Sequence, residues 1–161
     1  MKIRVLFVCL GNICRSPTAH GVFLRKVEEA GLADVIDVDS AGTGDWHIGR
    51  SPDSRSQAAA LMRDYDLSAL RARQVSAADF SKFDYILAMD KTNLSDLQRM
   101  RQGPDNCHLA LFLDYAAKLT ITEVPDPYYH GDDGFDQVLE LVEAGSLGLL
   151  ADIKIRLSDQ R

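Results

Sequence analysis

The chain has 161 residues, and 18 lysines and arginines against 24 aspartates and glutamates give it a formal net charge of −6. Its composition, 46% hydrophobic and 26% charged, excludes a disordered chain and predicts one folded domain over residues 1–161. The negative charge argues against a general binder of nucleic acid or membrane surfaces, and the longest apolar runs, residues 5–10 and 109–113, are too short to span a bilayer.

Strands and helices alternate along the chain. The hydrophobic pattern predicts strands over residues 2–8, 35–38, 84–89 and 108–113. It predicts helices over residues 17–30, 58–65, 92–101 and 135–157. Ser16 is expected to cap the first helix, with Pro17 at its first position, while Gly145 and Gly148 weaken the last prediction. The alternation indicates a three-layer α/β fold, a four-stranded parallel sheet with helices on both faces.

Two long irregular stretches, residues 43–53 and 114–133, interrupt this pattern, and loops of such length are usually functional. The loops that leave the carboxyl ends of the predicted strands begin at Cys9, Ser40, Asp90 and Asp114. In open α/β sheets these ends meet at one edge, where ligands bind. We therefore expect the functional site at this edge.

The three cysteines, Cys9, Cys14 and Cys107, predict neither a disulfide framework nor a structural zinc site. No Cys-x-x-Cys pair is present, and the four histidines fall at no metal-ligand spacing, so no metal is expected. The N-terminal apolar run is too short for a signal peptide and lacks a small-residue cleavage site after it. We therefore expect a cytoplasmic protein.

The loop after the first predicted strand carries the strongest chemical signal. It consists of Cys9, Leu10, Gly11, Asn12, Ile13, Cys14, Arg15 and Ser16. Gly11 and Asn12 tolerate positive φ, so successive N–H groups can turn inward and form a nest for an anion. The next helix directs its positive end into the same space, and Arg15 can bind two phosphoryl oxygens at once. These features predict a phosphate-binding loop and favour the thiolate of Cys9.

Each of these residues has a simpler explanation when taken alone. Cys9 would be a buried cysteine at the end of a strand, and Arg15 would be a solvated charge in the first turn of a helix. The combination argues against both, because a cation at a helix N-terminus is unfavourable unless an anion accompanies it. Phosphoryl transfer depends mostly on positioning and charge stabilisation, so this loop supplies most of what that reaction needs.

Residues 8–17 resemble the phosphate-binding loop of the low-molecular-weight protein tyrosine phosphatases. The Asp-Pro-Tyr sequence of that family has its match at residues 126–129, and further matches occur at residues 39–42, 45–46, 49–52, 72–74 and 84–87. The resemblance runs the length of the chain. It implies the fold of that family and an enzyme that hydrolyses phosphotyrosine and small aryl phosphates without a metal or organic cofactor.

The resemblance assigns the catalytic roles. Cys9 would take the phosphoryl group as a phosphocysteine, and Asp126 would protonate the leaving phenolate and then act as base for the attacking water. The chemistry requires such an acid, because a phenol with a pKa of ~10 leaves more easily when protonated. Arg15 would bind phosphate together with the loop from Leu10 to Cys14. Ser16 would donate a hydrogen bond to the thiolate, a role compatible with its alternative role as N-cap.

Supporting residues follow from the same resemblance. Asn12 and Ser40 match a pair that braces the loop through a side-chain hydrogen bond. Asp90 matches the carboxylate that orients Arg15, with a helix N-cap as its alternative role. The chain departs from the family at Leu70, where a histidine of the network around Asn12 commonly stands, so one member of that network is missing here.

Substrate selection is expected to depend on the depth of an apolar cleft, because phosphotyrosine reaches further than phosphoserine. Family positions that line this cleft correspond to Leu10, Ile13, Trp46, Tyr128 and Tyr129. His47 and Arg50 are candidates for tuning which peptides bind, or else ordinary solvated loop residues. Cys14 is expected to form a reversible disulfide with Cys9, as in the family, or else to be a small buried residue at the helix start.

The expected partners are phosphotyrosine proteins, among them a tyrosine kinase, with inorganic phosphate as product, and the expected state is a monomer or weak dimer. Two other functions are compatible with such a loop. A thiol-dependent arsenate reductase would need two further cysteines after the third strand, but residues 88–103 contain none and Cys107 is expected to be inert core. A non-catalytic phosphotyrosine-binding module would be expected to lack the nucleophile or the acid, and both Cys9 and Asp126 are present.

Overall fold

A computed structural model describes residues 2–128 and 132–159 of the chain. Its strands are β1 (Ile3–Cys9), β2 (Ile36–Gly42), β3 (Tyr85–Ala88) and β4 (His108–Leu111). They are parallel and lie in the order β2-β1-β3-β4, so β1 is an inner strand. The helices are α1 (Arg15–Glu29), α2 (Ser54–Leu61), α3 (Asp79–Lys82), α4 (Lys91–Met100), α5 (Asp132–Asp159) and the 3₁₀ helix η1 (Phe112–Tyr115). The predicted three-layer α/β fold is confirmed.

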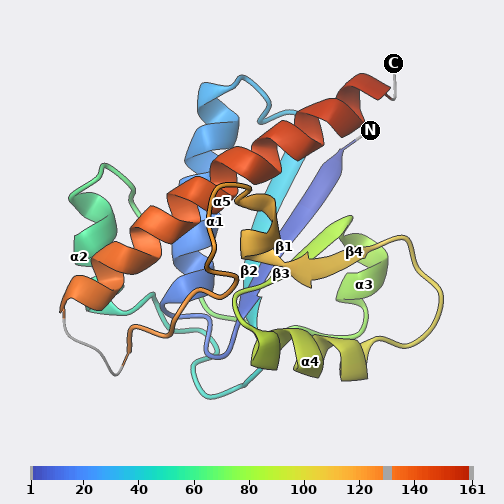
Figure 1. The fold of residues 1–161 in the computed structure, drawn as a ribbon. Coiled ribbons are helices and arrows are strands. Elements are labelled where there is room, and N and C mark those ends of the chain that lie inside the picture. The colour runs from blue at the N-terminus through green and yellow to red at the C-terminus, as the bar shows by residue number, and fades with distance from the viewer. Residues whose placement is uncertain (1, 129–131, 160–161) are drawn as a thin grey trace.

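Strand β1 supplies side chains to a hydrophobic core on each face of the sheet. Val5 and Phe7 pack on the face covered by α1 and α5, while Leu6 and Val8 pack on the face covered by α3 and α4 (Figure 1). Burial on both faces explains why its sequence is an almost continuous apolar run. None of the described helices is long and apolar enough to cross a membrane.

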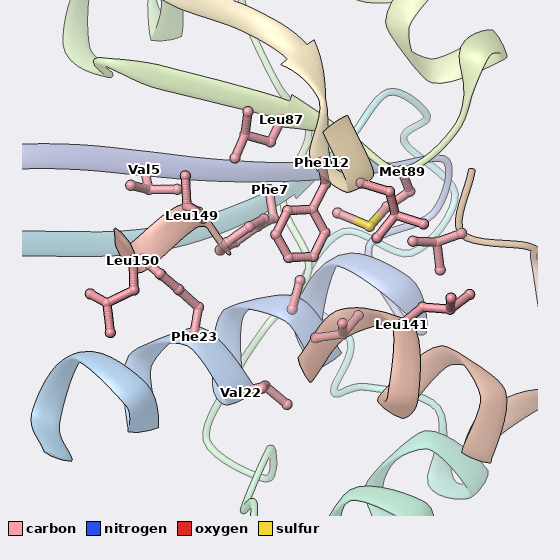
Figure 2. Close-up of a cluster of buried hydrophobic side chains, with 14 of the residues drawn as sticks. Val5, Phe7, Val22, Phe23, Leu87, Met89, Phe112, Leu141, Leu149 and Leu150 are labelled. Atoms are coloured by element: carbon pink, nitrogen blue, oxygen red, sulfur yellow. The ribbon is translucent and has the colours of Figure 1, made fainter. Parts of the chain in front are cut away.

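Aromatic packing fixes α1 against the end of β1. The ring of Phe7 makes edge contacts with Phe23 of α1 and Phe112 of η1, at centroid distances of 5.7 and 5.0 Å. Figure 2 shows this cluster, with Leu149 and Leu150 of α5 close to it. Truncating such a phenylalanine to alanine typically costs about 3–5 kcal/mol. The loop that joins β1 to α1 is therefore held between two firmly packed elements.

The glycines of α5 do not interrupt the helix. A Cβ at Gly148 would lie 1.7 Å from the carbonyl oxygen of Tyr115, and one at Gly145 would lie 2.8 Å from Cζ of Phe112. Both glycines therefore allow η1 to approach the helix more closely than any side chain would permit. The prediction that these glycines weaken the middle of the helix is therefore wrong, because close packing offsets the lower helix propensity of glycine.

Other element boundaries differ from the sequence prediction for local reasons. Helix α2 begins at Ser54 because Asp53 caps it by accepting a hydrogen bond from Arg55 N, and it ends before Asp64, which adopts a φ of 68°. Tyr65 therefore lies outside the helix. Strand β4 ends at Leu111, where the chain turns into η1, and α3 has too few residues to give a hydrophobic period.

Candidate active site

A cavity of about 460 Å³ opens where β1 runs into α1. Its lining residues come from three separate segments and are Cys9, Leu10, Gly11, Ile13, Cys14, Arg15, Trp46, His47, Asp126 and Tyr128. The structure thus brings together the cysteine loop, the long loop after β2 and the Asp-Pro-Tyr segment. All three had been singled out in the sequence.

The sulfur of Cys9 is buried and surrounded by hydrogen-bond donors. Asn12 N donates to it at 3.3 Å, and the Ser16 hydroxyl lies 3.1 Å away. When the sulfur is a thiolate, Ser16 must be the donor of that pair. Within residues 2–128 and 132–159, the N–H groups of Gly11, Ile13 and Cys14 have no hydrogen-bond partner, so they remain available to an anion.

Ser16 does not cap α1. The helix begins at Arg15 with Cys14 at the cap position and no side-chain cap. The Ser16 hydroxyl instead accepts a hydrogen bond from Asn12 Nδ2 at 2.7 Å and lies 3.3 Å from the carbonyl oxygen of Ala41. The expectation of an N-cap is therefore wrong, because this hydroxyl turns towards the loop and the sulfur.

Gly11 and Asn12 contribute to the loop in different ways. Asn12 adopts the positive φ, at 57°, whereas Gly11 does not. A Cβ at Gly11 would lie 3.0 Å from Cδ2 of His47, so glycine allows that ring to approach without having to shift. The positive φ expected for Gly11 is therefore wrong, and the positive φ expected for Asn12 is confirmed.

The brace around Asn12 also differs from expectation. Asn12 Nδ2 donates to Ser16, and Asn12 Oδ1 accepts from the backbone N–H of Arg73 at 3.0 Å. Ser40 pairs instead with His20, at 3.1 Å between Oγ and Nδ1. The predicted direct hydrogen bond between Asn12 and Ser40 is therefore wrong, because packing places His20 beside the Ser40 hydroxyl and places Ser16 and Arg73 beside the Asn12 amide.

Two of the residues in this brace are themselves firmly held. Asp39 and Asp79 both bind the side chain of Arg73, at 3.0 and 3.1 Å. His20 is buried, and burial lowers its pKa, so the ring is neutral at physiological pH although Asp39 opposes the shift. Leu70 is partly buried and packs against the hydrophobic core.

Arg15 is a buried cation at the start of a helix, with only 3% of its surface exposed. Its Nη1 donates to Asp90 Oδ2 at 2.5 Å and to the carbonyl oxygen of Val124 at 3.1 Å, while Nη2 lies 3.8 Å from Asp126 Oδ2. Burial opposes the charge, but the negative charges of Cys9, Asp90 and Asp126 outweigh it and raise the pKa of Arg15. The guanidinium therefore stays charged in the cavity.

Asp90 fills both of the roles that the sequence offers as alternatives, orienting Arg15 and capping a helix. One carboxylate oxygen accepts from Arg15, and the other accepts from Asn93 N at 2.8 Å and caps α4. A single aspartate can serve both donors because a carboxylate has two oxygens with separate lone pairs.

Asp126 lies in the cavity wall, and its side chain is 37% exposed. Its Oδ1 accepts from Tyr128 N at 3.0 Å, which forms a local turn around Pro127. The segment before it is anchored, because buried Val124 donates its N–H to the carbonyl oxygen of Met89 at 2.8 Å. Tyr129 lies outside the described residues.

The mouth of the cavity is apolar and aromatic. Leu10, Ile13, Trp46 and Tyr128 line it, and Trp46 is 66% exposed. His47 lies between this cavity and an adjoining one of about 380 Å³ that Arg50 lines. Such an arrangement suits a flat ring that carries an anionic group at its inner end.

The remaining cysteines differ from Cys9 in their surroundings. All three are free and buried, and burial raises the pKa of Cys14 and of Cys107 to about 12. Cys107 precedes β4, so it lies at the edge of the parallel sheet opposite to Cys9, which ends β1. Among the described residues, no group of three or more histidine, cysteine, aspartate or glutamate side chains could hold a metal ion.

Sequence reasoning missed several contacts that complete the site. Val124 and Met89 anchor the segment before Asp126, and Arg55 of α2 donates to the carbonyl oxygen of Tyr128 at 3.4 Å. His20 supports Ser40 from α1. Arg73, whose N–H donates to Asn12, was also missed, although it lies in one of the short family matches, whereas Arg55 and His20 have no such signal.

A thiol, a guanidinium and a carboxylate line one cavity, together with loop N–H groups that have no partner among the described residues. Such a set of groups suits a phosphate monoester, because N–H donors and a guanidinium bind anionic oxygens and a thiolate can attack phosphorus. The fold and the site together define the class of cysteine-dependent phosphatases.

Comparison with known proteins identifies the family. Residues 4–159 match the family model described as low molecular weight phosphotyrosine protein phosphatase. A low molecular weight protein-tyrosine-phosphatase of Streptomyces coelicolor is 44% identical over 157 residues, which cover 96% of this chain and 95% of the relative. The chain belongs to this family, and it is an enzyme, a cysteine-dependent hydrolase of phosphate monoesters. The resemblance stated from the sequence is confirmed.

Solved structures give the same result. The crystal structure of YfkJ from Bacillus subtilis is 41% identical, with a TM-score of 0.89 and 97% of each chain covered. That of DARP, a drosophila arginine phosphatase, is 34% identical, with a TM-score of 0.88 and 96% of this chain and 98% of that chain covered.

Proposed function

We propose that this enzyme hydrolyses phosphotyrosine in proteins, and small aryl phosphates, in two steps through a phosphocysteine on Cys9. The observation that carries the proposal is that Cys9, Arg15 and Asp126 line one cavity although Asp126 is far from the others in sequence. Its apolar mouth matches the ring of a tyrosine and its donor-lined floor matches a phosphate.

In the first step, the Cys9 thiolate attacks phosphorus. A sulfur–phosphorus bond forms, and the bond from phosphorus to the phenolic oxygen breaks. Asp126 gives its proton to that oxygen, so a neutral phenol leaves. Arg15 and the N–H groups of the loop stabilise the charge on the equatorial oxygens, and they need no rearrangement because the loop is already in place.

In the second step, water attacks the phosphocysteine. Asp126, now a carboxylate, takes a proton from the water, the sulfur–phosphorus bond breaks, and inorganic phosphate is released. The leaving sulfur returns to a thiolate that accepts hydrogen bonds from Ser16 and Asn12 N. These two donors act in both steps, because the sulfur carries charge at the start of the first and at the end of the second.

The choice of substrate follows from the length of the phosphorylated side chain and from the residues that line the cavity. A phosphoserine side chain is shorter than phosphotyrosine, so we expect it to bring phosphorus to the buried sulfur past Leu10 and Trp46 less readily. The likeness to an arginine phosphatase makes phosphoarginine the competing substrate. We favour the aryl ester because the mouth is aromatic and apolar.

The proposal is tested with three peptides of one sequence that carry phosphotyrosine, phosphoserine or phosphoarginine. We expect phosphate release from the phosphotyrosine peptide alone. Cys9→Ser should abolish turnover while inorganic phosphate still binds, as measured by calorimetry. Near-normal activity of Cys9→Ser would refute the mechanism, faster release from phosphoarginine would change the substrate, and peptide binding without phosphate release would support a binding module.

We further propose that oxidation of Cys9 is reversed through Cys14. Peroxide would convert the Cys9 thiolate to a sulfenic acid, and the sulfur of Cys14 would then displace water and form a disulfide. Both sulfurs belong to the lining of one cavity, which supports this pairing. Cys14→Ser should lose the recovery of activity by a dithiol after peroxide treatment; unchanged recovery would exclude the disulfide.

The remaining expectations concern the setting of the enzyme. We propose that it acts in the cytoplasm on phosphotyrosine proteins, among them a tyrosine kinase. Retention of phosphorylated proteins on immobilised Cys9→Ser enzyme, and their release by phosphate, would identify these substrates. If only proteins without phosphotyrosine are retained, this assignment of partners is wrong.

A further inference from the structure

The segment that carries Asp126 is anchored on both sides. On the upstream side, Val124 is buried, its N–H donates to Met89 at the end of β3, and its carbonyl oxygen accepts from Arg15. This anchor consists of core groups that the fold requires in any case. The downstream side has a different anchor, because Tyr128 is half-exposed and belongs to no helix or strand.

The downstream anchor is Arg55 of α2. Its Nη1 donates to the carbonyl oxygen of Tyr128 at 3.4 Å, and the guanidinium lies over two rings, 5.2 Å from that of Tyr128 and 4.8 Å from that of Phe135. Tyr128 in turn donates its N–H to Asp126 Oδ1 at 3.0 Å. The position of Tyr128 therefore sets the direction of the Asp126 carboxyl group.

Arg55 is itself held in place by Asp53. The guanidinium binds both carboxylate oxygens, with Nε 3.1 Å from Oδ1 and Nη2 3.0 Å from Oδ2. The backbone N–H of Asp53 donates to the carbonyl oxygen of Ile13, within the phosphate-binding loop, at 2.8 Å. A continuous chain of contacts thus runs from the phosphate-binding loop through Asp53, Arg55 and Tyr128 to Asp126.

The exposure of Arg55 argues against a mainly stabilising role. Its side chain is 42% exposed, and ion pairs with that much solvent contact contribute little to folding. A planar guanidinium, by contrast, can bind a carboxylate with two nitrogens, a carbonyl oxygen with a third and aromatic faces with its plane. Its geometry therefore matches the task of holding two loops at a fixed separation.

We propose that Arg55 is a positioning residue for the reaction, which holds Asp126 at the correct distance from the phosphate bound above Cys9. The inference rests on the proposed function, in which Asp126 transfers the proton to the leaving group. Loss of Arg55 would leave the phosphate-binding loop intact and would let the carboxyl group drift. A displacement of about 1 Å at a reacting group can cost up to about 10²-fold in rate.

The test compares two substrates that share a ring but differ in their need for acid. For Arg55→Met, kcat/KM for phenyl phosphate should fall about tenfold more than kcat/KM for p-nitrophenyl phosphate, because nitrophenolate leaves readily without a proton. Adding Asp126→Ala to Arg55→Met should leave the ratio of the two substrates as it is in Asp126→Ala alone. Inorganic phosphate should bind with unchanged affinity.

A matched control is available at the other end of α2. Arg63 follows that helix and pairs with Glu143 of α5 at 2.5 Å, remote from the segment of Asp126. Arg63→Met should leave the substrate ratio unchanged. Should Arg55→Met fail to fold, Arg55→Lys gives the same test, because lysine keeps the charge but cannot reproduce the three-way contact.

Equal losses on both substrates, or a ratio no different from that of Arg63→Met, would overturn the positioning role. So would a further change of the ratio when Arg55→Met is added to Asp126→Ala. If the unmodified enzyme hydrolyses neither aryl phosphate, the proposed function has failed, and that outcome is distinct from a uniform effect of Arg55.

Discussion

Two segments line one cavity but are built differently: the phosphate-binding loop, residues 9–15, and the segment of residues 124–128, called the acid segment because we propose Asp126 as the general acid. The loop is short and mostly buried, and Asn12 links Cys9 within it to Ser16 and Arg73 around it. The acid segment is tied to the protein on either side of Asp126, whose own side chain is 37% exposed. Charge stabilisation requires donors that do not move, whereas a group that must give and then regain a proton benefits from contact with water.

The sharpest way to test this difference is to replace the planar guanidinium of Arg15. Arg15→Lys should lower kcat/KM by about 10³-fold on phenyl and p-nitrophenyl phosphate alike, because a single ammonium cannot bind two phosphoryl oxygens at once. Steady-state kinetics on both substrates measures this loss. A loss that depended on the leaving group would mean that the loop also governs proton transfer. The two segments would then not have separate functions.

Removal of the acid should give the opposite pattern. Asp126→Ala is expected to lower kcat/KM about 10²–10³-fold for phenyl phosphate and about tenfold or less for p-nitrophenyl phosphate, since only the poorer leaving group needs a proton. A plot of log kcat/KM against the pKa of the leaving phenol should become steeper. A parallel downward shift of that plot would remove Asp126 from the acid role.

A smaller effect is expected at the residue that orients Arg15. Asp90→Asn keeps an oxygen that can cap α4 but loses the charge that faces Arg15, so kcat/KM should fall about tenfold or somewhat more with little change in the unfolding temperature. Asp90→Ser, which also caps a helix, is the control and should behave in the same way. A large fall in unfolding temperature in both variants would show that the ion pair is mainly structural.

The smallest effect concerns the surroundings of the phosphate-binding loop. Burial lowers the pKa of His20, so between that value and about 6.5 the unfolded chain binds more protons than the folded one, and stability is lost as pH falls. The His20→Gln variant lacks the imidazole and therefore lacks this contribution to the pH dependence of stability. The free energy of unfolding of the variant should depend less on pH between 7 and 5 than that of the unmodified protein, by at most about 1.4 kcal/mol per pH unit. Denaturant titrations of both proteins measure the slopes, and equal slopes would show that His20 titrates normally.

The sequence alone was sufficient for the sheet and for the nucleophilic half of the site. Four apolar runs separated by amphipathic stretches indicate a parallel sheet, because both periods are local properties of the chain. The loop from Cys9 to Arg15 is contiguous, and its donors, its asparagine with positive φ and its arginine lie within seven residues. Any compact folding of that segment between a strand and a helix brings them together.

Tertiary packing decided the rest. Ser16 turns to the sulfur instead of capping α1, and Asn12 takes Arg73 as its partner instead of Ser40. Gly148 is required by the carbonyl oxygen of Tyr115, and Arg55 reaches Tyr128 from a helix more than seventy positions earlier in the chain. A polar group binds whichever partner packing brings within about 3 Å, and side-chain periodicity says nothing about groups that meet only when separate elements dock.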